Sequence, residues 1–233
     1  MSSRSTERPE PPEPPERLER RQHRLPRRFY ARPSTLVARE LLGRVFVRSG
    51  RAGARVAARI VETEAYEQTD PASHSFRGLT ARNAVMFGPA GHLYVYFTYG
   101  MHFCMNVVTD REGWGSAVLM RAAEPLEGVA TMRRRRGTTD LRLLCSGPAR
   151  FTQALGIDRR FGGVDLVDGS TLWIERGVPV PSARVEIGPR VGIRSGVEQP
   201  WRFSIAGDPF VSRGRPLSAP RARRQSASEQ LRG

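Results

Sequence analysis

Lysine is absent from this sequence of 233 residues, so all 38 of its Lys and Arg positions are arginine. The absence excludes every mechanism that needs a lysine side chain, such as a Schiff base, a P-loop phosphate contact or a lysine general base. An all-arginine composition also indicates a GC-rich genome, and we therefore expect a bacterial protein.

Cysteine and long apolar runs are also scarce. Cys104 and Cys145 are the two cysteines, too few for a disulfide framework and without the CxxC spacing of a zinc site. No apolar stretch reaches the ~20 residues of a membrane span, and residues 1–9 lack the apolar region of a secretory signal. We expect a cytoplasmic protein that uses no metal and no cofactor.

Positive charge is what the sequence has in excess, with a formal net charge of +15 at pH 7. Residues 1–28 are rich in proline and arginine, and residues 213–233 hold six arginines against one glutamate. Segments so poor in apolar residues are typical of disorder. We predict a disordered leader over 1–28, one domain over 29–212 and a disordered tail over 213–233. The basic arms either tether nucleic acid or only keep the protein in solution.

The middle of the chain mixes helical and strand patterns. Capping and stop residues predict one helix between Ser34 and Gly43 and another over 125–136. A third begins after Ser146, which would be its cap, with Pro148 at an early position. Strand patterns occupy residues 44–48, 55–66, 92–98 and 102–108, and strand-and-turn sequence fills 162–211. Without regular alternation, this order predicts an α+β fold: a single compact domain with a mostly antiparallel, curved sheet flanked by helices.

Two glutamates on the predicted strand 55–66 share one face. Period-two alternation puts Glu62 and Glu64 on the same side as Tyr66, opposite the small or apolar Val61 and Ala65. The apolar face would then cover the core, and the carboxylate face would need water or a functional cleft. A single strand glutamate is most often only a solvated charge.

Four of the five tyrosines fall between positions 66 and 99. Tyr94 and Tyr96 share one face of a predicted hairpin, and Tyr99 lies at its tip beside Gly100. An aromatic side chain at a tip cannot fold back into its own core, so it is an interaction residue or a wedge between base steps. Arginines that hold phosphates, rings that stack on an extruded base and a carboxylate that activates water form a coherent set.

A series of motifs in chain order resembles the alkyladenine (3-methyladenine) DNA glycosylase family, from about residue 25 to 211. The motifs are ETEAY at 62–66, HS at 74–75, RN at 82–83, YVYFTYGM at 94–101, FCMN at 103–106, AVLMRAAEPLEG at 117–128 and CSGP at 145–148. Enzymes of this family flip a damaged purine out of the duplex and hydrolyse its N-glycosidic bond, which begins base excision repair.

The resemblance implies a role for each matching residue. Glu64 would be the general base that activates the attacking water, and Arg121 would support that water and a nearby phosphate. The other implied roles are stacking on the base for Tyr66, His74 and Tyr96, the pocket floor for Asn106 and DNA intercalation for Tyr99. It also implies a monomeric enzyme without a lyase step that acts on double-stranded DNA in the nucleoid, on alkylated and, as an open question, deaminated purines.

Three other interpretations use the same residues. The arginines and tyrosines could belong to a non-catalytic nucleic-acid-binding module. Glu62 and Glu64 could serve a carbohydrate glycosidase, although two carboxylates on one strand face do not face each other across a bond. His92, His102 and Cys104 could ligate a metal, the least favoured of the three.

Overall fold

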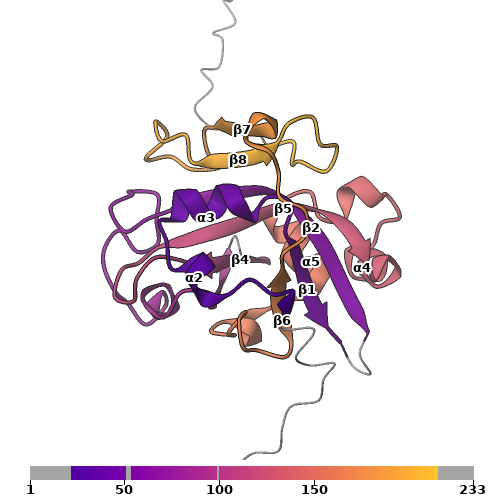
Figure 1. Cartoon of the computed structure of the whole chain (residues 1–233), viewed down its shortest axis with the longest axis horizontal. Coiled ribbons are helices and arrows are strands. Elements are labelled where there is room, and N and C mark those ends of the chain that lie inside the picture. Colours follow the sequence, from indigo (N-terminus) through magenta and orange to yellow (C-terminus); the bar gives the residue numbers. More distant parts are fainter. Residues whose placement is uncertain (1–21, 51–53, 99, 215–233) are drawn as a thin grey trace, which may run out of the picture.

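The structure, a computed structural model, describes residues 22–50, 54–98 and 100–214 (Figure 1). Its strands are β1 (Val45–Ser49), β2 (Arg55–Tyr66), β3 (Leu93–Thr98), β4 (His102–Val108), β5 (Ala117–Glu127), β6 (Leu172–Glu175), β7 (Val185–Gly188) and β8 (Arg202–Ile205). Its α-helices are α2 (Arg27–Tyr30), α3 (Ser34–Leu41), α4 (Val129–Arg136) and α5 (Pro148–Leu155), with 3-10 helices at Ala84–Phe87, Leu141–Leu143, Arg159–Phe161 and Ser182–Arg184.

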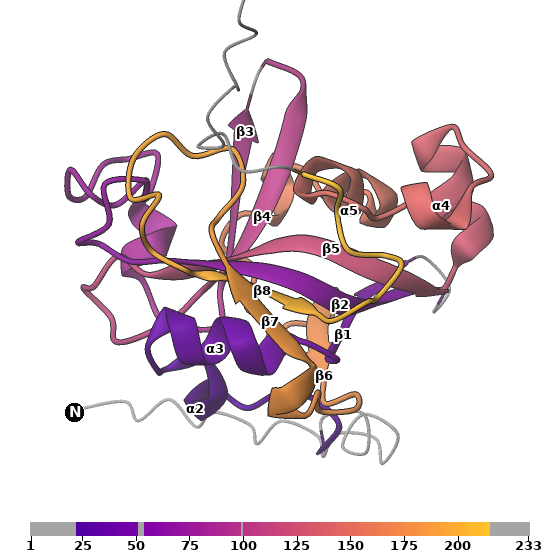
Figure 2. The ribbon, with the colours of Figure 1, turned by 90° about the horizontal axis from the view of Figure 1, so that it is seen from above.

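The strands form one sheet in the order β3-β4-β5-β2-β1-β6, and β8 pairs with both β2 and β7. Every pairing between these strands is antiparallel. Figure 2 shows α2 and α3 on one side of β2 and β5, with α4 and α5 on the other. The predicted α+β fold with an antiparallel sheet is confirmed. In the described part of the chain, no helix combines the length and the hydropathy that crossing a membrane requires.

The helix α3 covers β2 through one apolar stripe. Its buried residues Ser34, Val37, Ala38 and Leu41 recur at helical spacing, which places them on the same face. Thr63 on β2 donates its hydroxyl hydrogen bond to the carbonyl of Ala38 at 2.8 Å. This contact assigns one face of β2 to the helix and leaves the opposite face of the strand for other partners.

The long β2–β5 ladder has three register shifts, and two of them are bulges that follow one another along the strands. The register passes from Ile60↔Ala123 to Glu62↔Ala122 and then to Thr63↔Met120. Val61 on β2 and Arg121 on β5 are therefore skipped, and each bulge redirects the side chains that follow it. Both interruptions lie beside Glu62, where the structure brings charged groups together.

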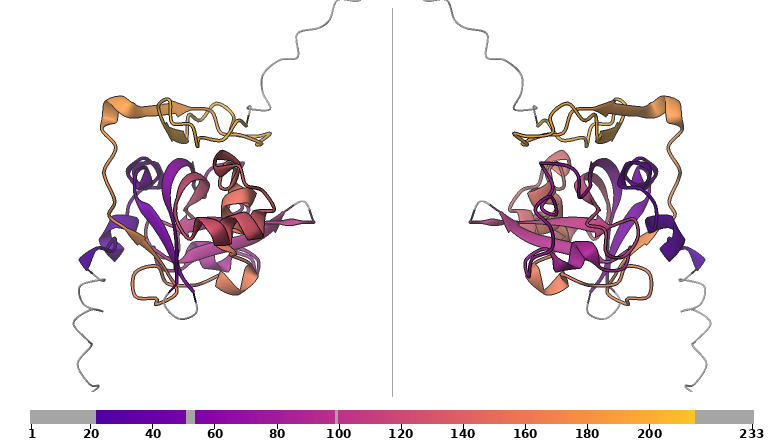
Figure 3. Two further views of the ribbon diagram at one scale, coloured as in Figure 1. Left: turned by 90° about the vertical axis from the view of Figure 1, so that its right-hand side faces the viewer. Right: turned by 90° about the vertical axis from the view of Figure 1, so that its left-hand side faces the viewer.

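The β3–β4 hairpin projects from the body of the molecule (Figures 2 and 3). Its register pairs Tyr94 with Asn106 and Tyr96 with Cys104. Figure 3 also shows β7 and β8 as a layer along another side. Tyr99, predicted at the hairpin tip, lies outside the described residues.

One predicted helix boundary and one predicted helix cap were wrong. Residues 125–127 do not begin a helix but end β5, because Pro125 pairs with Ala58 next to a register shift, a place where a strand tolerates proline. The strand β5 itself was not predicted. Helix α5 is preceded by Gly147 with φ +135° and no side-chain cap. Ser146 instead accepts a hydrogen bond from Arg150 Nη1 at 3.2 Å.

The folded domain begins earlier than residue 29. Leu25 is 2% exposed within the main core, and its amide donates to the carbonyl of Ile174 at 2.9 Å. Arg24 forms a β-bridge with Glu175. The proline-rich composition around this leucine concealed its packing against β6. Residues 1–21 and 215–233 lie outside the described residues, so the predicted disorder of the two arms stays a prediction.

Candidate active site

Two glutamates of β2 share one arginine of β5. Arg121 Nε donates to Glu62 Oε1 at 3.0 Å, and Arg121 Nη1 lies 3.2 Å from Glu64 Oε1. The side chains of both glutamates are fully buried, and that of Arg121 is 6% exposed. The bulge at Arg121 directs its guanidinium onto the carboxylate face, so one buried cation compensates two buried anions.

Glu62 has little capacity left for chemistry. Its Oε1 also accepts from Arg202 Nε at 2.6 Å, and its Oε2 accepts from the amide of Ser212 at 2.8 Å. Burial raises the pKa of Glu62, but Arg121, then Arg202 and Ser212, lower it by more, so the net pKa lies below 4.5. A carboxylate that two arginines keep in its charged form is a poor proton acceptor. This argues against a carbohydrate glycosidase that would use both glutamates.

Glu64 is held by donors on both oxygens but keeps accepting capacity. The amide of Val191 donates to Oε1 at 2.7 Å, and the Tyr66 hydroxyl donates to Oε2 at 2.8 Å. Burial, followed by the nearby Glu64 charge, raises the pKa of Tyr66 well above 10, so the phenol stays protonated. A carboxylate oxygen has two lone pairs, and Oε2 uses one of them for Tyr66. Glu64 can therefore receive a proton from a third group.

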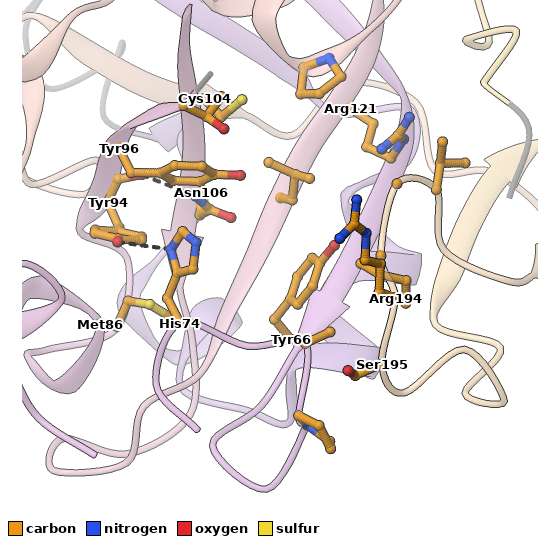
Figure 4. A pocket seen from close by; sticks show the side chains of 18 residues that line it. Tyr66, His74, Met86, Tyr94, Tyr96, Cys104, Asn106, Arg121, Arg194 and Ser195 are labelled. Atoms are coloured by element: carbon orange, nitrogen blue, oxygen red, sulfur yellow. Dashed lines mark hydrogen bonds between the residues drawn. The ribbon is translucent and has the colours of Figure 1, made fainter. Parts of the chain in front are cut away.

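A pocket of about 380 Å³ opens in front of this carboxylate (Figure 4). The three residues that contact Glu64, its ion-pair partner Arg121 and the hydrogen-bond donors Tyr66 and Val191, all line it. Glu64 therefore lies directly behind the lining, shielded from solvent. The volume is within the range of small-molecule sites, roughly 300–1,000 Å³.

One wall of the pocket is aromatic. His74 Nδ1 and the Tyr94 hydroxyl are 3.0 Å apart, and the His74 and Tyr96 ring centroids are 4.5 Å apart at 80°. The ring centroids of Tyr94 and Tyr96 are 5.7 Å apart, and their ring planes differ by 27°. Figure 4 shows these rings on one side and Tyr66 on the other. A flat, electron-poor ligand would meet ring surfaces from both sides.

The structure brings together six of the seven predicted site residues. Glu64 and Arg121 form the charged network, while Tyr66, His74, Tyr96 and Asn106 line the pocket with Arg121. Asn106 is 5% exposed and donates its side-chain amide to the Tyr94 carbonyl at 3.3 Å. The seventh, Tyr99, lies outside the described residues.

Burial, and secondarily the positive charge of Arg82, lower the pKa of His74 from its ordinary 6.5. Its imidazole should therefore be neutral at pH 7 and would not repel a cationic ligand. We expect an NMR titration of the His74 ring to give a midpoint below 6.5. Arg82→Gln should raise that midpoint, because the variant removes the neighbouring charge. A wild-type midpoint at or above the ordinary value would contradict this assignment.

Several pocket residues escaped the sequence analysis. The segment 191–195 forms the wall beside Tyr66 and reaches the site from between β7 and β8. Tyr94 was assigned to the correct strand face but not to the pocket. Ser212 joins the charged network from the predicted domain's last position. Neither the segment 191–195 nor Ser212 has a local sequence signal, because the pairing of β8 with β2 is what brings the C-terminal region to Glu62 and Glu64.

Six arginines of α4, α5 and the 3-10 helix between them form an arginine cluster along the chain. It consists of Arg133, Arg134, Arg135, Arg136, Arg142 and Arg150, and none of these forms an ion pair with a carboxylate of the described residues. Burial and then Arg150 lower the pKa of Arg136, as expected for crowded cations. The first residue of α5, Pro148, lines the pocket. Helix α5, which carries Arg150, therefore reaches the pocket, and cations without carboxylate partners suit a polyanion.

Within residues 22–50, 54–98 and 100–214, no group of three His, Cys, Asp or Glu side chains could hold a metal ion. His92, one of the residues in the metal interpretation, is engaged elsewhere: its Nδ1 is 2.9 Å from the Pro89 carbonyl. Cys104 lines the pocket, and burial raises the pKa of its thiol. The described residues thus give no support to the metal interpretation.

Comparison with known proteins identifies the family. Residues 28–209 match the family model described as methylpurine-DNA glycosylase (MPG). A Chlorobaculum parvum protein is 47% identical over 207 residues, 88% of this chain and 98% of its own length. Proteins of Carboxydothermus hydrogenoformans (49% identical; 81% of this chain, 98% of the relative) and Rhodopseudomonas palustris (50% identical; 81% and 90%) are also similar. All three carry the name "Putative 3-methyladenine DNA glycosylase". The chain belongs to the methylpurine-DNA glycosylase family.

Proposed function

We propose that this enzyme, a DNA N-glycosylase, excises alkylated purines from double-stranded DNA by hydrolysis of the N-glycosidic bond. One observation carries the proposal: the Glu64 carboxylate is buried behind a ring-walled pocket and is held there by Arg121, Tyr66 and Val191. The pocket has room for one nucleobase, and the base can reach it only if its nucleotide leaves the helix.

In the proposed reaction Glu64 removes a proton from a water molecule in the pocket. The water oxygen attacks the sugar C1′, and the bond from C1′ to the base nitrogen breaks with its electron pair going to the base. An N3- or N7-alkylated purine is cationic before this step and leaves as a neutral molecule, so little acid catalysis is needed. A positioned base contributes about 10²- to 10⁴-fold, and the anion stabilises positive charge on the sugar.

Recognition of the base would come from the rings. Tyr66, His74 and Tyr96 would stack on the flipped base, and each tyrosine contact with a cationic ring is worth about 0.5–2 kcal/mol. Asn106 would form the floor and obstruct the 2-amino group of normal guanine. Whether deaminated purines, which carry no charge, are also excised depends on stacking and shape alone.

The DNA itself would lie against the arginine cluster of α4, α5 and the 3-10 helix between them. Its phosphates need cations, and the six arginines without a carboxylate partner would supply them. Tyr99 would fill the gap left by the flipped nucleotide, a role that rests on its motif. We also infer a monomeric enzyme, and the proposed substrate implies a location in the bacterial nucleoid.

The test is an excision assay on methylated duplex DNA. We expect the purified protein to release free methylpurine and to leave abasic sites in an intact backbone, because the chain has no lysine for a lyase step. Chromatography measures the released base, and denaturing electrophoresis measures strand breaks. Breaks in a buffer that spares abasic sites would refute the hydrolytic mechanism. Binding without base release would favour the non-catalytic module.

A further inference from the structure

Arg190 and Asp70 form a buried ion pair behind the pocket. Both side chains are fully buried, and Arg190 is the largest fully buried side chain among the described residues. Arg190 Nη2 donates to Asp70 Oδ1 at 2.9 Å, and its Nη1 bonds the second carboxylate oxygen. Neither residue lines the pocket or contacts Glu64, so the reaction proposed above does not use them directly.

The pair joins the two loops that form the pocket walls. Arg190 Nη2 donates to the carbonyl of Gly196 at 3.0 Å, which closes the segment 190–196 on itself. Asp70 Oδ1 also accepts from the amide of Ala72 at 3.0 Å and so holds the loop that leads to His74. The second contact of Arg190 Nη1, to the Ala65 carbonyl at 3.0 Å, fixes both loops to the end of β2.

Both neutral donors to Glu64 depend on this arrangement. Val191 follows Arg190 directly, and its amide donates to Glu64 Oε1. The guanidinium of Arg190 lies 4.7 Å from the centroid of the Tyr66 ring, whose hydroxyl donates to Glu64 Oε2. The guanidinium also lies 5.3 Å from the centroid of the Trp201 ring. A displacement of Arg190 would therefore move the ring and the amide together.

We propose that Arg190 and Asp70 are a positioning pair that sets both neutral hydrogen-bond donors of Glu64 and holds the two pocket loops together. The inference rests on the proposed function, since it assigns the pair to the same reaction. Reactions of this kind lose about 10²-fold in rate when a reacting group moves by about 1 Å. The pair therefore controls the rate of the chemical step without touching the substrate.

The first experiment compares Asp70→Asn with Asp208→Asn. Asp208 is also an aspartate paired with an arginine: its side chain is 7% exposed and lies 2.8 Å from Arg59, but it is outside the pocket. We expect Asp70→Asn to lower the single-turnover rate of base release about 10- to 100-fold with little change in the KM for DNA. Asp208→Asn should keep the wild-type rate.

A second pair of variants acts through sterics rather than charge. A Cβ at Gly196 would lie 2.6 Å from Asp70 Oδ1 and 2.9 Å from Arg190 Nη2, whereas one at Gly207 would meet open space. Both glycines have a positive φ, +61° and +69°, so Gly196→Ala and Gly207→Ala bear similar backbone strain. Only Gly196→Ala should slow base release and speed hydrogen exchange of the Val191 amide.

The outcomes separate the two proposals. If the wild-type protein releases no base, the proposed function fails, whatever the variants do. If the wild type is active and both Asp70→Asn and Gly196→Ala match its rate, the positioning pair is refuted. Equal losses in the Asp208→Asn and Gly207→Ala controls would also refute it, because they would show an effect of stability alone. If Asp70→Asn does not fold, the positioning role is tested by comparing Gly196→Ala with Gly207→Ala, both in the rate of base release and in the hydrogen-exchange rate of the Val191 amide.

Discussion

Replacing Glu64 by glutamine is expected to lower the rate of base release by about 10²- to 10⁴-fold. Glutamine keeps the size of the side chain and can still accept from the Val191 amide, but it cannot take a proton from water. Single-turnover kinetics on a methylated duplex measures the loss. Duplex affinity, measured in the same buffer, should not fall, since Glu64 does not line the pocket and removal of an anion does not weaken binding to a polyanion.

The matched control is Glu124→Gln. Glu124 is a strand glutamate paired with Arg59 at 2.6 Å, and it lies outside the pocket. We expect this variant to release base at the wild-type rate. A Glu64→Gln variant with undiminished release would remove Glu64 from its role as general base. If neither the wild type nor the variant released base while both bound DNA equally, the non-catalytic module would be the better interpretation.

Local patterns predicted the parts of the site that lie close together in sequence. Alternation along residues 55–66 placed Glu62, Glu64 and Tyr66 on one strand face, and the structure keeps them together. The β3–β4 hairpin and the pairing of the Tyr94 and Tyr96 rings also follow from period-two spacing. In both cases the geometry of a single strand determines which side chains are neighbours.

The remaining features depend on contacts between distant segments. The carboxylate face was expected to meet water or a cleft, but Arg202 and Ser212 cover Glu62 from residues 140 and 150 positions away. The bulge at Arg121 lies on a strand that was not predicted, since Pro125 and the arginine run after it have a helical pattern. No local sequence pattern distinguishes Arg190 from the rest of the 38 arginines. Its burial follows from its pairing with Asp70, 120 positions earlier.

The two glutamates need Arg121 for stability as well as for chemistry. It is the one residue that contacts both carboxylates among the described residues. Without it, Glu62 keeps Arg202 and the Ser212 amide, but Glu64 keeps only the neutral donors Val191 and Tyr66. Removal of one partner from a buried ion pair costs about 3–5 kcal/mol, because a charge is left uncompensated in a medium of low polarity.

We therefore expect Arg121→Gln to lower the free energy of unfolding at pH 7 by about 3–5 kcal/mol, and base release to fall with it. The matched control is Arg55→Gln. Arg55 also bridges two carboxylates, Glu127 and Glu175, but its side chain is 29% exposed. Exposed pairs contribute about 0–1 kcal/mol, so this variant should unfold close to the wild type. Urea titration monitored by circular dichroism measures the free energy of unfolding of the wild type and of both variants.

The loss of stability in Arg121→Gln should depend on pH. In the wild type the pKa of Glu62 lies below its ordinary 4.5, so the stabilisation from this carboxylate is present above pH 4.5 and is lost as the pH falls through the lowered value. In Arg121→Gln the stabilisation from the Glu62 carboxylate is already smaller at neutral pH. The difference between wild type and variant should therefore be largest at neutral pH and shrink below pH 4.5. A difference that is under 1 kcal/mol at pH 7, or that stays constant down to acid pH, would mean that Arg121 does not compensate the buried carboxylates.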